Sequence, residues 1–148
     1  SNKLQRAYYP INEKTIFQFN KTFRKLTKNK KKQKINLNIK GRILIIYDFY
    51  DGTAKFDFKS LCDDNLGAED YLEISKVCKF VAIENIPIFN NENINQQQRF
   101  ITLIDIFYEK KISLMISLET DLENLNSSQK LLKPFNRTLS RLYELTSQ

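Results

Sequence analysis

The fold is decided by residues 80–118, which read FVAIENIPIFNNENINQQQRFITLIDIFYEKKISLMISL. Residues 80–83 are an apolar run of strand length, and Pro87 ends that segment. Residues 96–111 then place apolar side chains on one face of a helix, and residues 112–118 form a second apolar run. A strand, a helix and a strand in this order predict a βαβ unit, in which two parallel strands are joined by a right-handed crossover.

The N-terminal part predicts an extended segment followed by a helix. Tyr8 and Tyr9 precede Pro10, and a residue before proline avoids the helical region. Asn12 is a suitable cap for a helix that ends at about Leu26. Apolar residues recur in this helix at helical spacing, so we expect one buried stripe. The stripe comprises Ile16, Phe17, Phe19, Phe23 and Leu26.

Three strands are predicted between this helix and the βαβ unit. Residues 35–39 and 54–58 alternate between apolar and polar side chains, which is typical of strands. Residues 42–47 are a continuous apolar run and indicate a buried strand. Residues 48–52 end in Asp-Gly and indicate a turn, so we expect a hairpin or meander here.

The remaining segments predict helices that would pack on this sheet. Residues 68–77 and 138–145 are helical in pattern, whereas 121–132 are weakly helical and expected to be mobile, and Pro134 should break that segment. The residues expected to face inward are Tyr71, Leu72 and Val77 in the first helix and Leu139, Leu142 and Tyr143 in the second. We therefore predict an α/β fold, with a mixed sheet of about five strands and helices packed on it.

Composition favours one packed domain, covering residues 1–148, and excludes several kinds of chemistry. Hydrophobic residues make up 41% of the chain, which is enough for a core. The absence of histidine excludes a Ser-His-Asp triad and a histidine-ligated zinc site in this chain. Cys62 and Cys78 both lie among apolar residues, which predicts buried thiols and a reducing compartment. No run approaches the ~20 apolar residues that span a bilayer.

The positive charge is concentrated in one segment. Residues 21–40 contain nine of the 24 Lys and Arg residues and no Asp or Glu. We expect a basic, flexible loop at 27–34, whose candidate binding residues are Lys28, Lys30, Lys31, Lys32 and Lys34. Such a tract could bind nucleic acid or an anionic membrane surface. No interleaved aromatic pattern for single-strand stacking is visible, and a solvated loop is the favoured interpretation.

An ordered series of segments resembles a known family. The segments are residues 56–62, 66–72, 86–87, 99–105 and 135–142. Their order and spacing resemble the C-terminal half of the ZapE-like ATPases, which are P-loop proteins of bacterial cell division with mitochondrial relatives. A phosphate-binding loop requires Gly-x-x-x-x-Gly-Lys-Ser/Thr. None of the three glycines, Gly41, Gly52 and Gly67, begins or ends that pattern.

The resemblance implies a C-terminal fragment of an ATPase. The full-length protein would use ATP and Mg²⁺ and couple hydrolysis to cell division or protein quality control, whereas the fragment would need no cofactor and would not hydrolyse ATP alone. The implied partners are the rest of the ATPase domain, the division apparatus and a second copy of the chain. Peripheral membrane association is compatible with this function, and nucleic acid is not favoured. The implied compartment is the bacterial cytoplasm or the mitochondrial matrix side. The alternative is a non-catalytic interaction module whose basic loop binds nucleic acid or an anionic membrane.

Three arginines are the candidate functional residues within the matching segments. Arg99, Arg137 and Arg141 could sense nucleotide or bridge subunits, because the guanidinium group stays charged and binds phosphate oxygens in pairs. Asp105 and Glu144 are candidates for positioning them. The alternative is a purely structural pairing, in which these acids hold arginines and fix the last helix. The family favours two adjacent arginines where this chain has Gln98-Arg99, so only Arg99 carries over.

Overall fold

The protein contains one mixed sheet of six strands, as a computed structural model that describes residues 5–63 and 65–147 shows. The sheet order is β1-β6-β5-β4-β3-β2, and the four strands from β1 to β4 in this order are parallel. Their bounds are Ala7–Tyr8 (β1), Gln33–Ile39 (β2), Arg42–Tyr50 (β3), Thr53–Asp57 (β4), Phe80–Ile86 (β5) and Ser113–Leu118 (β6). The predicted α/β class is confirmed. The sixth strand arises because the extended segment before Pro10 pairs with β6.

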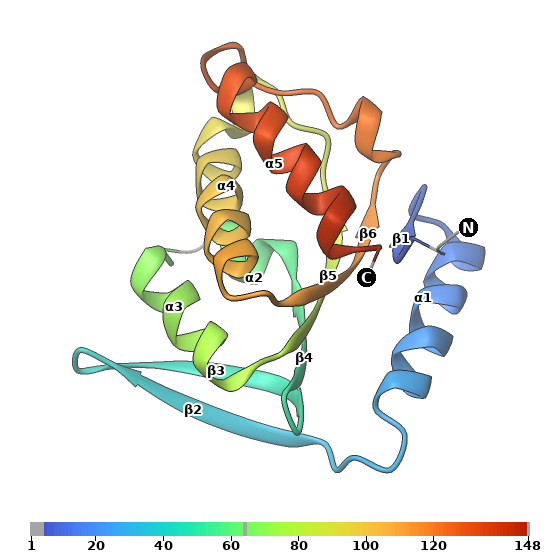
Figure 1. Ribbon diagram of the computed structural model, residues 1–148, viewed down its shortest axis with the longest axis vertical. Coiled ribbons are helices and arrows are strands. Elements are labelled where there is room, and N and C mark those ends of the chain that lie inside the picture. Colours follow the sequence, from blue (N-terminus) through green and yellow to red (C-terminus); the bar gives the residue numbers. More distant parts are fainter. Residues whose placement is uncertain (1–4, 64, 148) are drawn as a thin grey trace.

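Helices cover both faces of the sheet, but unequally (Figure 1). The helices α2, α3, α4 and α5 lie on one face of the sheet, and α1 lies on the other. Their bounds are Glu13–Leu26 (α1), Phe58–Cys62 (α2), Ala68–Val77 (α3), Ile94–Glu109 (α4) and Leu132–Leu145 (α5). The two faces have separate apolar clusters: Val81 and Ile83 of β5 face the larger helical layer, whereas Ala82 packs with Phe19 and Phe23 of α1.

The predicted βαβ unit is present, as β5, α4 and β6. β5 and β6 are parallel, with Val81 opposite Leu114 and Ile83 opposite Ile116, and α4 connects them. Residues 100–107 of α4 supply the side chains that the spacing predicts to be buried. A second crossover, through α2 and α3, places β4 parallel to β5. None of the helices among the described residues is long and apolar enough to cross a membrane.

The three-stranded meander is confirmed, but two details of the prediction are wrong. β3 continues to Tyr50, so residues 48–50 are strand, and only Asp51 and Gly52 make the turn. Both residues of that turn have positive φ, 47° and 89°, which is the two-residue hairpin geometry that Asp-Gly favours. The run 42–47 is not a buried strand, because Ile43 and Tyr47 are each 63% exposed. Both residues lie on the face of β3 opposite Leu44 and Ile46, which pack against the main core.

Several predicted inward faces are also corrected. In α1, Phe19 and Phe23 are buried, but Ile16 and Phe17 are 45% and 62% exposed because one helix over a sheet buries only one narrow face. Leu72 in α3 and Tyr143 in α5 are likewise exposed. The buried side chains of these two helices include three that the prediction did not name: Ile74, Phe135 and Leu145.

Pro134 does not break a helix; it lies in the first turn of α5. Proline is tolerated there because the first backbone N–H groups of a helix have no intrahelical partner. The segment before α5, predicted to be weakly helical, contains two short 3-10 turns, Leu122–Asn124 and Gln129–Leu131. Gln97 of α4 holds this segment. Its buried amide accepts from the Ser128 backbone at 3.0 Å and donates to Ser127 Oγ at 2.7 Å.

Candidate functional site

Two of the three candidate arginines meet a candidate acid between α4 and α5. Asp105 faces α5, where Arg137 and Arg141 are one turn apart on the same side. Arg141 Nη1 lies 2.5 Å from Asp105 Oδ1, and Arg137 Nη2 lies 3.5 Å from Oδ2. The side chain of Arg137 is 59% exposed and that of Arg141 is 20% exposed. Asp105 therefore holds Arg141 closely and leaves most of the Arg137 guanidinium group open to solvent.

Tyr108 and Glu144 extend this cluster by one helical turn. The Arg141 guanidinium carbon lies 4.5 Å from the centre of the Tyr108 ring, which is a cation–π contact. The Tyr108 hydroxyl donates to the Glu144 carboxylate, and this hydrogen bond is the main reason that the pKa of Tyr108 is raised. Glu144 thus acts on Arg141 through Tyr108. These contacts hold Arg141 between α4 and α5 and leave Arg137 as the more exposed of the two arginines.

Arg99 belongs to a different cleft. Its Nη1 donates to the backbone carbonyl of Cys62 at 3.0 Å, and it lines a hollow of about 460 Å³ beside the start of α3. Across this hollow Arg42 forms an ion pair with Asp70, which is only 1% exposed. Asp70 also accepts from the Gly67 backbone N–H at 2.8 Å. Because Asp70 already holds Arg42, Arg99 is the remaining cation of this cleft.

A hollow of about 490 Å³ lies at the carboxyl ends of the parallel strands. Asp57 ends β4, Asn85 lies near the end of β5 and Glu119 follows β6. Asn85 has a positive φ of 66° and donates its amide to Asp57 Oδ1 at 2.8 Å. Ligands of open α/β sheets usually bind at this edge. The sequence interpretation missed these residues, although polar side chains directly after predicted strands could have indicated them.

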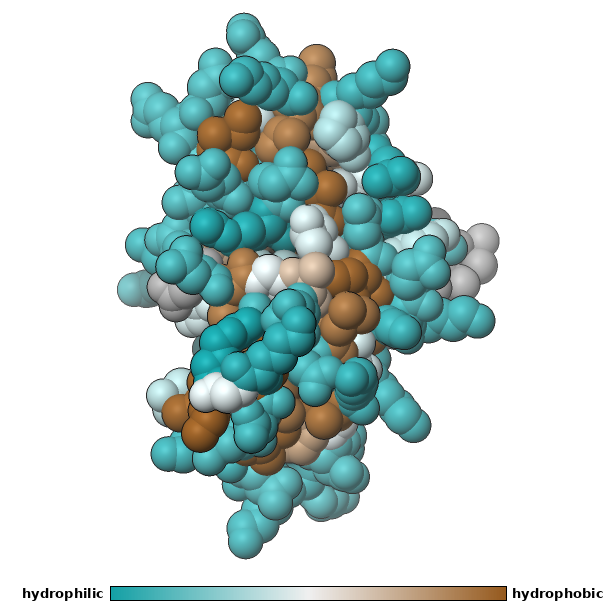
Figure 2. Space-filling view, turned by 90° about the vertical axis from the view of Figure 1, so that its left-hand side faces the viewer, coloured by the Kyte–Doolittle hydropathy of each residue, from teal (hydrophilic) through white to brown (hydrophobic). Residues whose placement is uncertain are grey.

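The lining of this hollow does not fit a nucleoside triphosphate. The hollow at the strand ends is lined by the acids Asp57, Asp63 and Glu119, with Lys59 as its cation, and acidic oxygens repel a triphosphate. The described part of the chain also contains no cluster of three or more acidic or sulfur ligands that could hold a metal ion. Arg137 does fit a phosphate oxygen, because its guanidinium group is charged and largely exposed. The outer surface of the α4 side carries mostly hydrophilic residues, with separate hydrophobic patches (Figure 2).

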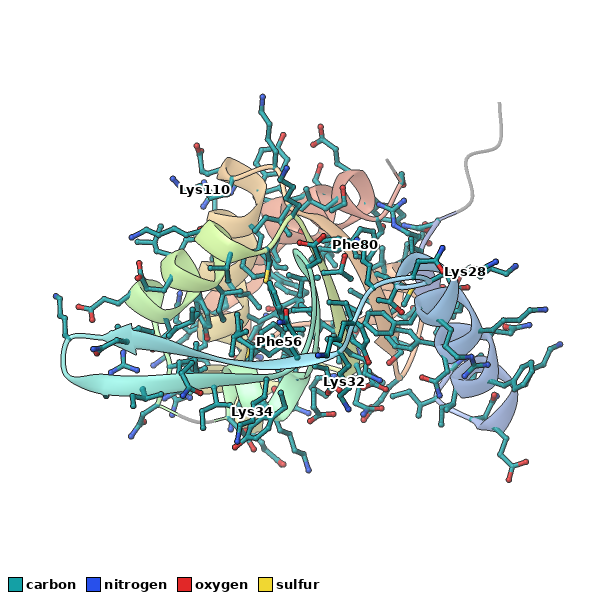
Figure 3. The ribbon with its side chains drawn as sticks, turned by 90° about the horizontal axis from the view of Figure 1, so that it is seen from below. Lys28, Lys32, Lys34, Phe56, Phe80 and Lys110 are labelled. Carbon is teal, nitrogen blue, oxygen red and sulfur yellow. The ribbon has the colours of Figure 1, made fainter. Side chains whose placement is uncertain are left out.

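The basic tract is less loop-like than the sequence suggests. The connection between α1 and β2 spans residues 27–32, and Lys34 lies within β2 because the strand begins at residue 33. Lys32 Nζ is 3.1 Å from Asp48 Oδ1, and Lys34 Nζ is 5.9 Å from the centre of the Tyr47 ring. Lys28, Lys30 and Lys31 are exposed in the connection. The tract therefore continues from the loop along the last strand of the sheet (Figure 3).

Comparison with known proteins places the chain in a family. All 148 residues match the sequence profile of the AFG1-like ATPases. Cell division protein ZapE of Escherichia coli strain K12 is 30% identical over 139 residues, which cover 94% of this chain and 37% of ZapE. Lactation elevated protein 1 homolog B of Danio rerio is 36% identical over 89 residues, which cover 60% of this chain and 18% of that protein.

This chain thus spans little more than a third of the length of the ZapE protein that it matches. No solved structure matches this chain significantly. The family profile covers the βαβ unit, the cluster of Asp105, Arg137 and Arg141 (the arginine–aspartate cluster), and the hollow at the strand ends. The ZapE-like resemblance inferred from the ordered segments is confirmed, and the chain belongs to the AFG1-like ATPase family.

Proposed function

We propose that this chain is the C-terminal part of an ATPase that couples the binding and hydrolysis of ATP, with Mg²⁺, to cell division in the bacterial cytoplasm. The observation that carries the proposal is the family match over all 148 residues. The relative that covers most of the chain is named as a cell division protein, which supports the process. Because the 148 residues contain no Gly-x-x-x-x-Gly-Lys-Ser/Thr, the phosphate-binding loop belongs to another part of the protein.

Within this ATPase, the arginine–aspartate cluster supplies the positive charge that reaches the nucleotide or a neighbouring subunit. Arg137 is the contacting group because its guanidinium is exposed and only weakly held, at 3.5 Å from Asp105. Asp105 and the Tyr108–Glu144 pair position Arg141. These contacts fix which face of α5 is turned toward α4 and therefore which face carries the exposed Arg137. Arginines of this kind stabilise the charge that develops on the transferred phosphoryl group. Arg99 is the second candidate, at its own cleft.

The arginines are tested by steady-state ATP turnover of the full-length protein with Arg99, Arg137 or Arg141 replaced by alanine. We expect Arg137→Ala to lower kcat by about 10²-fold or more, because a charge-stabilising arginine contributes at least this much in other P-loop NTPases. Lys110→Ala is the matched control, since Lys110 is an exposed cation at the end of α4, and it should leave turnover unchanged. Unchanged turnover in all three arginine variants, each shown to be folded, would reject the proposed role.

Isothermal calorimetry tests whether the chain by itself holds the nucleotide. We expect no Mg²⁺-dependent ATP binding by the 148 residues with a Kd tighter than about 1 mM, because the backbone cradle for the phosphates is missing. A control titration with full-length protein should show binding under the same conditions. Micromolar, magnesium-dependent binding by the 148 residues would contradict the proposal that the nucleotide site lies elsewhere.

A non-catalytic interaction module is the second candidate, favoured by the basic edge of the sheet around Lys34. One observation separates the two candidates. If the parent gene encodes Gly-x-x-x-x-Gly-Lys-Ser/Thr before Tyr8, the ATPase is supported, and if it does not, the binding module remains. In the ATPase, the division apparatus and a second copy of the protein are the proposed partners.

A further inference from the structure

β2 is the last strand of the sheet, and its outer edge has no partner strand among the described residues. The turn at Lys40 and Gly41 has positive φ at both positions, 48° and 85°, and closes a two-residue hairpin with Ile39 opposite Arg42. In such a hairpin the pair that flanks the turn exchanges both hydrogen bonds, and hydrogen-bonded pairs then alternate. Ile39, Leu37 and Ile35 therefore bond to β3, whereas the backbone groups of Asn38 and Asn36 point outward.

The side chains of β2 divide into an apolar row and a polar row. Ile35 and Leu37 are only half-buried, although they pack against the main core on the side of the larger helical layer. Lys34, Asn36 and Asn38 are exposed on the opposite side. A strand added to this edge would continue both rows. Its residues beside Ile35 and Leu37 would cover apolar surface, and those beside Lys34 would face a cation.

The charge around this edge selects the kind of strand that can be added. Residues 21–40 contain nine Lys and Arg residues and no acid. Lys32 is used by Asp48 and Lys40 by Glu69, whereas Lys28, Lys30 and Lys31 lie exposed in the connection that leads into β2. Lysines at an edge oppose pairing with a second copy of the same strand, because like charges would then face each other. The same lysines attract a strand that carries carboxylates.

We propose that the outer edge of β2 binds an extended, acidic segment of a partner protein by β-strand addition, with acidic and apolar residues alternating along that segment. The outward backbone groups of Asn36 and Asn38 supply the hydrogen bonds, and the lysines supply the preference for acid. This site requires neither nucleotide nor the arginine–aspartate cluster. Nucleic acid would use the lysines but not the outward amide ladder, and a membrane would not select an alternating sequence.

Binding is measured by fluorescence anisotropy with a labelled, blocked ten-residue peptide in which glutamate and valine alternate. The same peptide with N-methyl groups on alternate backbone nitrogens keeps the charge but cannot form the ladder, and a lysine–valine peptide reverses the charge. We expect only the unmodified acidic peptide to bind, more weakly as salt is raised. Amide hydrogen exchange at Asn36 and Asn38 should slow by about tenfold or more when this peptide is bound.

Variants of the protein locate the site. Lys31→Glu with Lys34→Glu should weaken binding about tenfold or more, because both charges beside the added strand are reversed. Lys110→Glu with Lys111→Glu makes the same change in charge at the far end of α4 and should change binding less than about twofold (Figure 3). Asn36→Pro removes an outward donor without removing a bond to β3, and edge strands tolerate such a proline. It should abolish peptide binding while the fold remains.

Three outcomes would overturn the proposal. One is equal binding of the N-methylated peptide, which would show attraction by charge alone. Another is the absence of protection at Asn36 and Asn38 in the presence of saturating acidic peptide. The third is binding of an oligo-dT strand or of phosphatidylserine vesicles in place of the peptide, with loss of that binding in the Lys31→Glu, Lys34→Glu variant. That result would assign the edge to nucleic acid or to a membrane instead.

Discussion

Replacing Phe100 with alanine is expected to lower the free energy of unfolding by about 3 to 5 kcal/mol. Phe100 lies on α4 with no exposed surface, and its ring centre is 5.7 Å from that of Phe58 and 5.6 Å from that of Phe89. Phe89 in turn contacts Phe135 of α5 edge-on at 5.3 Å. The aromatic rings thus join α2, α4, α5 and the segment after β5. Removing the Phe100 ring leaves a cavity beside Phe58 and Phe89 that the surrounding segments would have to close.

Urea unfolding followed by circular dichroism measures this loss. Phe17→Ala is the matched control, because the same atoms are removed from a side chain that is 62% exposed on α1. It should change stability by less than about 1 kcal/mol, as surface substitutions usually do. A loss for Phe100→Ala that is no larger than the loss for Phe17→Ala would contradict the central place of the aromatic cluster.

Raising the pH above 9 is expected to destabilise the protein steeply. Burial raises the pKa of Cys62 and that of Cys78 from the ordinary value of 9.0 to about 12 in each case. The side chains are 0% and 4% exposed, so the folded state keeps both thiols protonated after the unfolded chain has ionised. A folded pKa above the unfolded value contributes stability that is complete below pH 9 and is lost as the pH rises toward 12. Each thiol then contributes a loss of about 1.4 kcal/mol per pH unit.

Tyr71 adds to this loss at the upper end of the range. Its hydroxyl donates to the Leu61 carbonyl at 2.6 Å, and its pKa is raised, chiefly because burial disfavours the phenolate. Urea unfolding at pH 8, 9, 10 and 10.5 measures the slope. In the Cys62→Ala, Cys78→Ala variant the slope between pH 9 and 10 should largely disappear, whatever the starting stability. An unchanged slope would mean that groups other than the thiols control the alkaline transition.

Much of the fold was predictable because local pattern and tertiary packing agree in its centre. Two runs, 80–83 and 112–118, are apolar because both faces of a parallel sheet are covered. One face of α4 is apolar because it is buried against that sheet. The prediction failed where an apolar run has a different cause. Residues 42–47 look like a buried strand, but only Leu44 and Ile46 pack against the main core, whereas Ile43 and Tyr47 lie on the opposite face of β3 and stay exposed. Only the arrangement of the helices decides which apolar residues are covered.

The candidate site was predictable in part, for a related reason. The resemblance to a family identified Arg99, Arg137, Arg141, Asp105 and Glu144, but not which of them interact. Arg141 and Asp105 are 36 residues apart, and they meet because α5 folds back on α4. The same packing separates Arg99 from Arg137 and Arg141, because Arg99 donates a hydrogen bond to the backbone carbonyl of Cys62 on α2. Asp57, Asn85 and Glu119 were not found, because no pattern along the chain shows that three strand ends share one hollow.

The sequence by itself determined the α/β class, the parallel pair at its centre, the concentration of charge in residues 21–40 and the membership of an ATPase family. These properties are local or cumulative along the chain: hydrophobic period, turn residues, charge and ordered motifs. The tertiary structure alone decided that β2 ends the sheet, that Lys34 belongs to a strand edge, and that Asp105 leaves Arg137 open. Each of these depends on contacts between distant segments, which follow from how the helices and strands pack together and not from any one of them.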